Sequence, residues 1–176
     1  MTIQPFETNM DVHACNDVLH EHPSKPLLQG SLLQMTGNRA HFIFLDHTAD
    51  MGIQVTGQTL KALFENAAQS LMQIMIRERP AQKTSVFRIS VSAQDLSDLM
   101  VRWLGEILYL FEGESKVVMD IDIRSITKTR LTAITHVVPF NPEQHEVLSE
   151  IKAVTYHQIE VTRSRHGWQT NVIFDL

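Results

Sequence analysis

Two long segments of this sequence carry apolar residues at helical spacing, and they restrict the chain to folds that bury helices against other elements. Apolar residues recur at steps of three and four along 60–75, beginning with Leu60 and Leu63. The same spacing runs along 96–111, beginning with Leu96 and Leu99. Each stripe covers one wide helix face. We therefore predict two amphipathic helices of similar length, both packed against a core.

Polar residues at the ends of these segments predict where the helices begin and end. Thr59 and Asp95 are suitable N-caps, and Asp98 lies in a first helical turn, where the helix dipole favours a carboxylate. Pro80 predicts that the first helix ends before residue 80, and Gly113 predicts the end of the second helix.

Alternating apolar and polar residues predict strands around the two helices. The expected strands cover 41–45, 53–57, 87–91, 117–126, 130–138, 151–161 and 168–174. Most follow one another through short loops, as antiparallel strands do. The sequence thus predicts an α+β fold: two amphipathic helices packed on a mostly antiparallel β-sheet in a single domain.

Length and composition exclude several classes of protein. A chain of 176 residues with 43% hydrophobic residues suits one soluble domain with a real core. The net charge of −5 argues against a protein that grips nucleic acid through its own basic surface. The single cysteine, Cys15, excludes an internal disulfide, and no apolar run is long enough to span a bilayer. No secretory signal is visible at the N-terminus, so we expect a cytoplasmic protein.

The first forty residues differ from the rest of the chain. They contain Pro5, Pro23 and Pro26 and no sustained apolar stripe. We expect residues 1–40 to form a flexible N-terminal extension, and residues 41–176 to form the domain.

A short polar run between two expected strands carries the first candidate site residues. Asp46, His47 and Asp50 fall within five positions. Buried, such groups must be paired or bound to a cation, and Asp and His are ligands of divalent metals. From spacing alone, a polar turn in which Asp46 or Thr48 merely caps the backbone is favoured over a metal site, because short Asp clusters are common in loops.

Two further segments bear on that choice. In 150–157, strand alternation would place Lys152 on the same face as Glu150 and Tyr156. Its side chain would then reach out to water, or be held by Glu150 in a surface ion pair, or be held by another acid. The sequence ends on Asp175-Leu176, directly after an expected strand. Like charges at such an end repel unless a cation or base lies between them.

Taken together, these motifs resemble the signature regions of the archease family. The matching segments are Phe44–Ile53, Gly57–Ala68, Leu99–Tyr109, Glu150–His157 and Phe174–Leu176. The resemblance covers about residues 41–176 and leaves the N-terminal extension outside it.

The resemblance implies a function and a site. Archeases assist the GTP-dependent RNA-splicing ligase, promoting guanylylation of the ligase histidine and multiple turnover in tRNA ligation, with RNA reached only through the ligase. The family binds a divalent cation, calcium by resemblance, with magnesium or manganese as alternatives. Carried onto this chain, the ligands are Asp50, Asp175 and main-chain or terminal oxygens of Leu176, and the functional lysine is Lys152. Asp46, His47 and His157 match positions near the same site.

The sequence also departs from the family pattern, and other functions remain. Asn141 stands where the family often has an acid, which argues against a role of that loop in metal binding. One alternative is a general chaperone or modulator of protein–nucleic-acid complexes. Another is a stand-alone metal-dependent hydrolase using Asp46, His47, Asp50 and His157, although no base–nucleophile pair is identifiable by spacing. The resemblance favours an activator that has no catalytic residues of its own.

Overall fold

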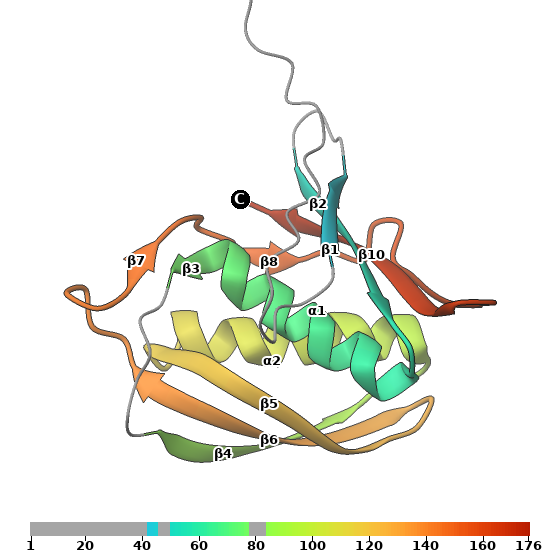
Figure 1. Cartoon of the computed structure of the whole chain (residues 1–176), viewed down its shortest axis with the longest axis horizontal. Coiled ribbons are helices and arrows are strands. Elements are labelled where there is room, and N and C mark those ends of the chain that lie inside the picture. The colour runs from blue at the N-terminus through green and yellow to red at the C-terminus, as the bar shows by residue number, and fades with distance from the viewer. Residues whose placement is uncertain (1–41, 46–49, 78–83) are drawn as a thin grey trace, which may run out of the picture. The chain divides into compact units, whose positions relative to one another are not determined.

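Two helices lie between two antiparallel β-sheets in the computed structural model (Figure 1). The structure describes residues 42–45, 50–77 and 84–176, all within one compact unit, Leu33–Leu176. The predicted extension over residues 1–40 lies outside the described residues.

The helices begin at the predicted caps. Helix α1 (Leu60–Met75) has Thr59 as its N-cap, and the Thr59 hydroxyl accepts a hydrogen bond from the backbone N–H of Ala62 at 3.0 Å. Helix α2 (Leu96–Glu112) is capped in the same way by Asp95 and ends at Gly113. Among the described residues, no helix is both long enough and apolar enough to cross a membrane.

The first sheet lies on one side of the helices and contains five strands. It comprises β1 (Phe42–Leu45), β2 (Met51–Gly57), β10 (Gly167–Asp175), β8 (Ala153–Val154) and β9 (Glu160–Ser164). The order is β1-β2-β10-β8, and β9 also pairs with β10.

The second sheet lies on the other side of the helices, with β6 at its centre. It comprises β4 (Ser85–Ser92), β6 (Arg130–Pro139) and β5 (Lys116–Ile126). A separate two-stranded ladder joins β3 (Ile76–Arg77) to β7 (Glu146–Val147). Every strand pair described is antiparallel, so the predicted α+β class is confirmed.

The helix layer explains the width of the apolar stripes. Helix α1 contacts both β2 and β5, while α2 contacts β8 and β9 on one side and β4 and β5 on the other. A helix covered on two sides must be apolar over more of its surface than one lying on a single sheet. The sequence predicted helices packed on one sheet, whereas the structure shows them between two.

The strand predicted over 151–161 is wrong as a single element. Only Ala153–Val154 pairs with β10 as β8, and β9 begins at Glu160. Between them Gln158 has φ 53°, and the Thr155 hydroxyl accepts a hydrogen bond from the backbone N–H of His157. A turn with a left-handed residue breaks the strand there. The other predicted strands are confirmed, with ends within about two residues.

Candidate metal centre

Two aspartates, distant in sequence, end neighbouring strands of the first sheet. Strands β2 and β10 pair with Met51 opposite Phe174. Asp50 immediately precedes β2, and the same register carried one residue beyond the strand would bring it opposite Asp175, at the Cα separation of about 4.5–5.5 Å typical of antiparallel pairs. Both residues are exposed.

These two aspartates extend a row of side chains on the outer face of the sheet. In the same row the Gln54 side-chain amide donates to Asn171 Oδ1 at 3.1 Å. Side chains two residues apart along a strand share a face, so Asp50 lies on the face of Gln54, and Asp175 on that of Asn171. The opposite face, carrying Ile53 and its neighbours, is buried against the helices.

Lys152 comes from a third segment and lies at the same end of the sheet. Its backbone N–H donates to the Asp175 carbonyl oxygen at 2.9 Å. Its Nζ donates to a main-chain oxygen of Leu176 at 2.8 Å. The side chain is therefore held at the strand end, and the alternative of a surface Glu150–Lys152 ion pair is not what the structure shows: no such pair is found among the described residues.

Of the remaining candidate residues, the structure describes only His157. Asp46 and His47 lie outside the described residues. His157 is exposed, and within the described ranges no hydrogen bond joins its ring to Lys152 or Leu176.

The donors at this end fit a hard cation. Asp50 and Asp175 supply carboxylate oxygens, and Leu176 supplies a main-chain oxygen, which are donor types that Ca²⁺ and Mg²⁺ use together with water. Within residues 42–45, 50–77 and 84–176, no group of three or more His, Cys, Asp or Glu side chains is positioned to hold a metal. The described residues would thus form only part of an oxygen-donor site, which water or a partner's ligands would have to complete.

A hydrogen-bonded cluster fastens the segment that follows Lys152 to the start of α2. The Tyr156 hydroxyl donates to Asp98 Oδ1 at 2.7 Å, and Arg102 Nε donates to the same oxygen at 2.7 Å. The backbone N–H of Gln94 donates to Asp98 Oδ2 at 2.9 Å. These bonds, with that from Tyr156 the strongest cause, lower the pKa of Asp98 from 3.8 to about 2. Sequence reasoning assigned Asp98 only to the helix dipole and missed this cluster; the Arg102 side chain four residues on was the available signal.

Replacing Tyr156 by phenylalanine should raise the pKa of Asp98 toward its ordinary value. The hydroxyl bonds to the charged carboxylate and so favours ionisation. Because the folded pKa lies below the unfolded value of about 3.9, the ionised Asp98 stabilises the fold above pH 4, and this contribution is lost as the pH falls toward 2. Carboxyl-carbon NMR titration measures the shift.

Tyr109→Phe is the matched control for that substitution. Tyr109 is another exposed tyrosine, and its hydroxyl lies near Glu114 rather than Asp98. We expect the Asp98 titration to be unchanged in this variant. An Asp98 titration that also stays unchanged in Tyr156→Phe would contradict the hydrogen bond.

Asn141 stabilises a turn through hydrogen bonds. Its Oδ1 accepts a hydrogen bond from the backbone N–H of Glu143 at 2.9 Å, and its own N–H donates to His145 Nδ1 at 2.9 Å. The His145 ring is 4% exposed and stacks on Phe140, and burial lowers the pKa of this histidine. The amide oxygen of Asn141 is therefore used in closing the turn.

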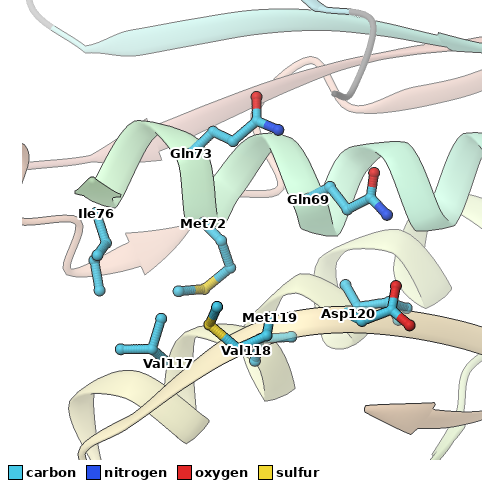
Figure 2. Close-up of a pocket in the computed structure, with 9 residues that line it drawn as sticks. Gln69, Met72, Gln73, Ile76, Val117, Val118, Met119 and Asp120 are labelled. Atoms are coloured by element: carbon cyan, nitrogen blue, oxygen red, sulfur yellow. The ribbon is translucent and has the colours of Figure 1, made fainter. Parts of the chain in front are cut away.

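A small pocket lies elsewhere, between α1 and β5 (Figure 2). Met72 of α1 and Ile76 of β3 line it on one side, and Val117 and Met119 of β5 on the other. Asp120 is the acidic residue among its lining residues. It contains none of the predicted site residues, so this pocket is separate from the candidate metal centre.

Known proteins resemble this chain over the whole of the described fold. Residues 42–176 match the model of the archease protein family (MTH1598/TM1083). The protein archease of Methanosarcina acetivorans is 34% identical over 137 residues, which cover 76% of this chain and 94% of that protein. The protein archease of Pyrococcus furiosus is 33% identical over 135 residues, covering 74% and 95%.

Solved structures share the fold. The solution structure of Methanobacterium thermoautotrophicum protein 1598 is 28% identical and has a TM-score of 0.64, covering 77% of this chain and 98% of that one. An archease from Thermotoga maritima, described as a possible chaperone, has a TM-score of 0.53 at 22% identity, which shows the fold alone; the match covers 75% of this chain and 94% of that one. On the family model and the sequence identities together, the chain belongs to the archease family.

Proposed function

We propose that this protein is a cytoplasmic accessory factor of the GTP-dependent RNA-splicing ligase and has no reaction of its own. In this role it promotes guanylylation of the ligase histidine and multiple turnover in tRNA ligation. Membership of the archease family supports the proposal.

One observation carries the proposal at the level of residues. Three segments distant in sequence bring Asp50, Asp175 and Lys152 to one exposed end of the first sheet. Exposed carboxylates with no buried partner add little to stability, so their convergence with a lysine favours a binding role.

A divalent cation completes the proposed site. Asp50, Asp175 and the main-chain oxygen of Leu176 would hold Ca²⁺, with Mg²⁺ or Mn²⁺ as alternatives. When bound, the ion would neutralise the carboxylates and offer a positive charge to nucleotide phosphates. Lys152 would hold the strand end in place and supply the positive charge nearest the site.

Ligation by the purified ligase, with GTP and metal, tests the function directly. Adding the parent protein should increase both the guanylylated fraction of the ligase and the number of turnovers. Asp50→Ala, Lys152→Ala and Asp175→Ala should each abolish this stimulation without changing the circular dichroism spectrum. Asp120→Ala is the matched control, since Asp120 is an exposed acid on the other sheet, and it should stimulate like the parent.

Other outcomes would replace the proposal. Full stimulation by all three variants would refute the assigned site. Equal protection of unrelated aggregating proteins, with no effect on ligation, would indicate a general chaperone, and substrate turnover without the ligase would indicate a hydrolase. Calorimetric titration with Ca²⁺, Mg²⁺ and Mn²⁺ separately should show binding that Asp50→Ala and Asp175→Ala remove.

A further inference from the structure

Positive charge is concentrated in two stretches of an otherwise acidic chain. Residues 123–142 and 161–174 contain no Asp or Glu, although the whole chain has 20 acidic residues. Within these stretches the basic residues are Arg124, Lys128, Arg130, Arg163 and Arg165, together with His136 and His166. Acidic and basic residues are therefore distributed very unevenly along the chain, although its net charge is −5.

Both stretches form tight β-hairpins that expose their basic residues. Lys128 lies in the loop between β5 and β6, and Arg165 in the loop between β9 and β10. Lys128, Arg130, Arg163 and Arg165 are all exposed. None of these four has an ion-pair partner among the residues that the structure describes.

Side-chain hydrogen bonds hold both turns in fixed conformations. The Thr127 hydroxyl accepts from the backbone N–H of Arg130 at 3.0 Å. The Ser164 hydroxyl accepts from the backbone N–H of His166 at 3.2 Å. The Arg163 guanidinium lies 5.9 Å from the centre of the Trp168 ring. Preorganised basic groups lose less entropy when they bind an anion.

The two hairpin tips lie at the same end of the helix layer, where α1 and α2 begin (Figure 1, right). Thr129 accepts a hydrogen bond from the backbone N–H of Ala93 at 2.9 Å, two residues before the N-cap of α2. Gly167 packs against Gly57 and Gln58, immediately before the N-cap of α1. The tips thus form one basic end, which we define as Lys128, Arg130, Arg163 and Arg165.

The basic end is remote from the candidate metal centre. Strand β10 runs from Gly167 at the basic end to Asp175 at the metal centre. At 3.3 Å per residue, the two ends are separated by about 26 Å. The basic end, formed by one hairpin from each sheet, and the candidate metal centre therefore lie at opposite ends of β10.

We infer that the basic end binds the phosphate backbone of RNA. Arginine presents a planar fork of donors that matches phosphate oxygens, and both tips together offer several such contacts to one strand. A protein partner would also need apolar contacts, yet the large exposed apolar side chains of the described residues lie outside both hairpin loops. This inference goes beyond the proposed function, in which RNA contacts only the ligase. It rests on the proposed function only in expecting RNA to be near this protein.

Fluorescence anisotropy with a labelled RNA stem–loop tests this inference in the absence of ligase. EDTA in the buffer removes any contribution from the candidate metal centre. We expect saturable binding at low salt that weakens steeply between about 50 and 200 mM KCl, with a log–log slope near −3 for four phosphate contacts. The variant in which all four basic-end residues are replaced by Gln should bind at least about tenfold more weakly and with a shallower slope.

A matched pair of double variants separates a specific surface from overall charge. Lys128→Gln with Arg165→Gln removes two charges from the basic end, one from each hairpin. Arg77→Gln with Arg88→Gln removes two exposed charges elsewhere, and it should bind RNA like the parent. Circular dichroism confirms that each variant is folded.

Three results would overturn the inference: no saturable RNA binding at low salt, equal weakening by both double variants, or equal competition by polyglutamate, which would indicate an acidic protein partner.

The proposed function is tested separately. If RNA does not bind while Asp50→Ala still abolishes ligase stimulation, this inference fails and the ligase role stands. If the basic end binds RNA but ligation is not stimulated, the ligase role fails and this inference stands.

Discussion

Replacing Trp103 by alanine should lower the free energy of unfolding by about 3–5 kcal/mol, the range for losing a large buried aromatic side chain. Trp103 is fully buried in α2 and lies in the helix layer between the sheets. Its Nε1 donates to the Phe64 carbonyl oxygen of α1 at 2.9 Å, so the side chain joins the two helices by packing and by a hydrogen bond. The cavity left by alanine would lie in the most enclosed layer of the fold, where neighbours collapse least.

Two further variants separate the contributions of Trp103. Trp103→Phe keeps most of the apolar volume and removes the hydrogen bond, so it should cost clearly less than Trp103→Ala. Trp168→Ala is the matched control, because Trp168 is a half-buried tryptophan on the hairpin of β9 and β10. Urea unfolding measures all three. A Trp103→Ala variant within about 1 kcal/mol of the parent would contradict the helix layer as described.

Local sequence patterns predicted the helices of this fold well. The caps at Thr59 and Asp95 and the end at Gly113 are decided by residues within a few positions of each other, and the structure confirms them. The number of sheets was not predictable in this way. Whether an apolar stripe faces one sheet or two depends on how distant strands pair, and strand spacing does not specify that. The ladder of β3 and β7, with two residues in each strand, is too short to have a period.

The candidate metal centre, too, was predictable from the sequence only in part. The sequence singled out Asp50, Lys152 and Asp175 through a family resemblance, and the structure places them at one end of a sheet. What sequence could not supply is the register between β2 and β10, because its pairs are separated by more than a hundred residues. A register shifted by one residue would turn Asp50 toward the core side. Metal binding itself stays a prediction.

Whole-chain composition gave no information about how the charges are distributed over the molecule. The net charge of −5 argued against binding of nucleic acid through a basic surface; this prediction assumes an evenly distributed charge and stays untested. The hairpins that carry Lys128 and Arg165 belong to different sheets, and their sequence separation gives no sign that they turn at the same end. The common end is revealed by the hydrogen bond between Thr129 and Ala93, just before α2, and by the close approach of Gly167 to Gly57 and Gln58, just before α1.

Glycine-to-alanine substitution should have opposite effects at two positions. In Gly57→Ala, the new Cβ would lie 2.3 Å from the Leu63 backbone nitrogen and 2.8 Å from the Ala62 carbonyl carbon. Both atoms belong to the backbone of α1, so the helix or the end of β2 must move, and we expect a loss of about 1–3 kcal/mol or more. In Gly105→Ala, nothing lies within 4 Å of the new Cβ, and helix propensity should raise the stability of α2 by up to about 1 kcal/mol.

The opposite signs make this pair a sharp test of how closely β2 approaches α1. Both variants gain one methyl group, so a difference between them in urea unfolding reports the surroundings rather than the residue type. Equal effects at the two positions would contradict the close approach. Gly57 also touches Gly167, so a shift at this point should spread to the hairpin of β9 and β10. We therefore expect Gly57→Ala to disturb the amide signals of Arg165 and His166 in NMR spectra, whereas Gly105→Ala should leave them unchanged.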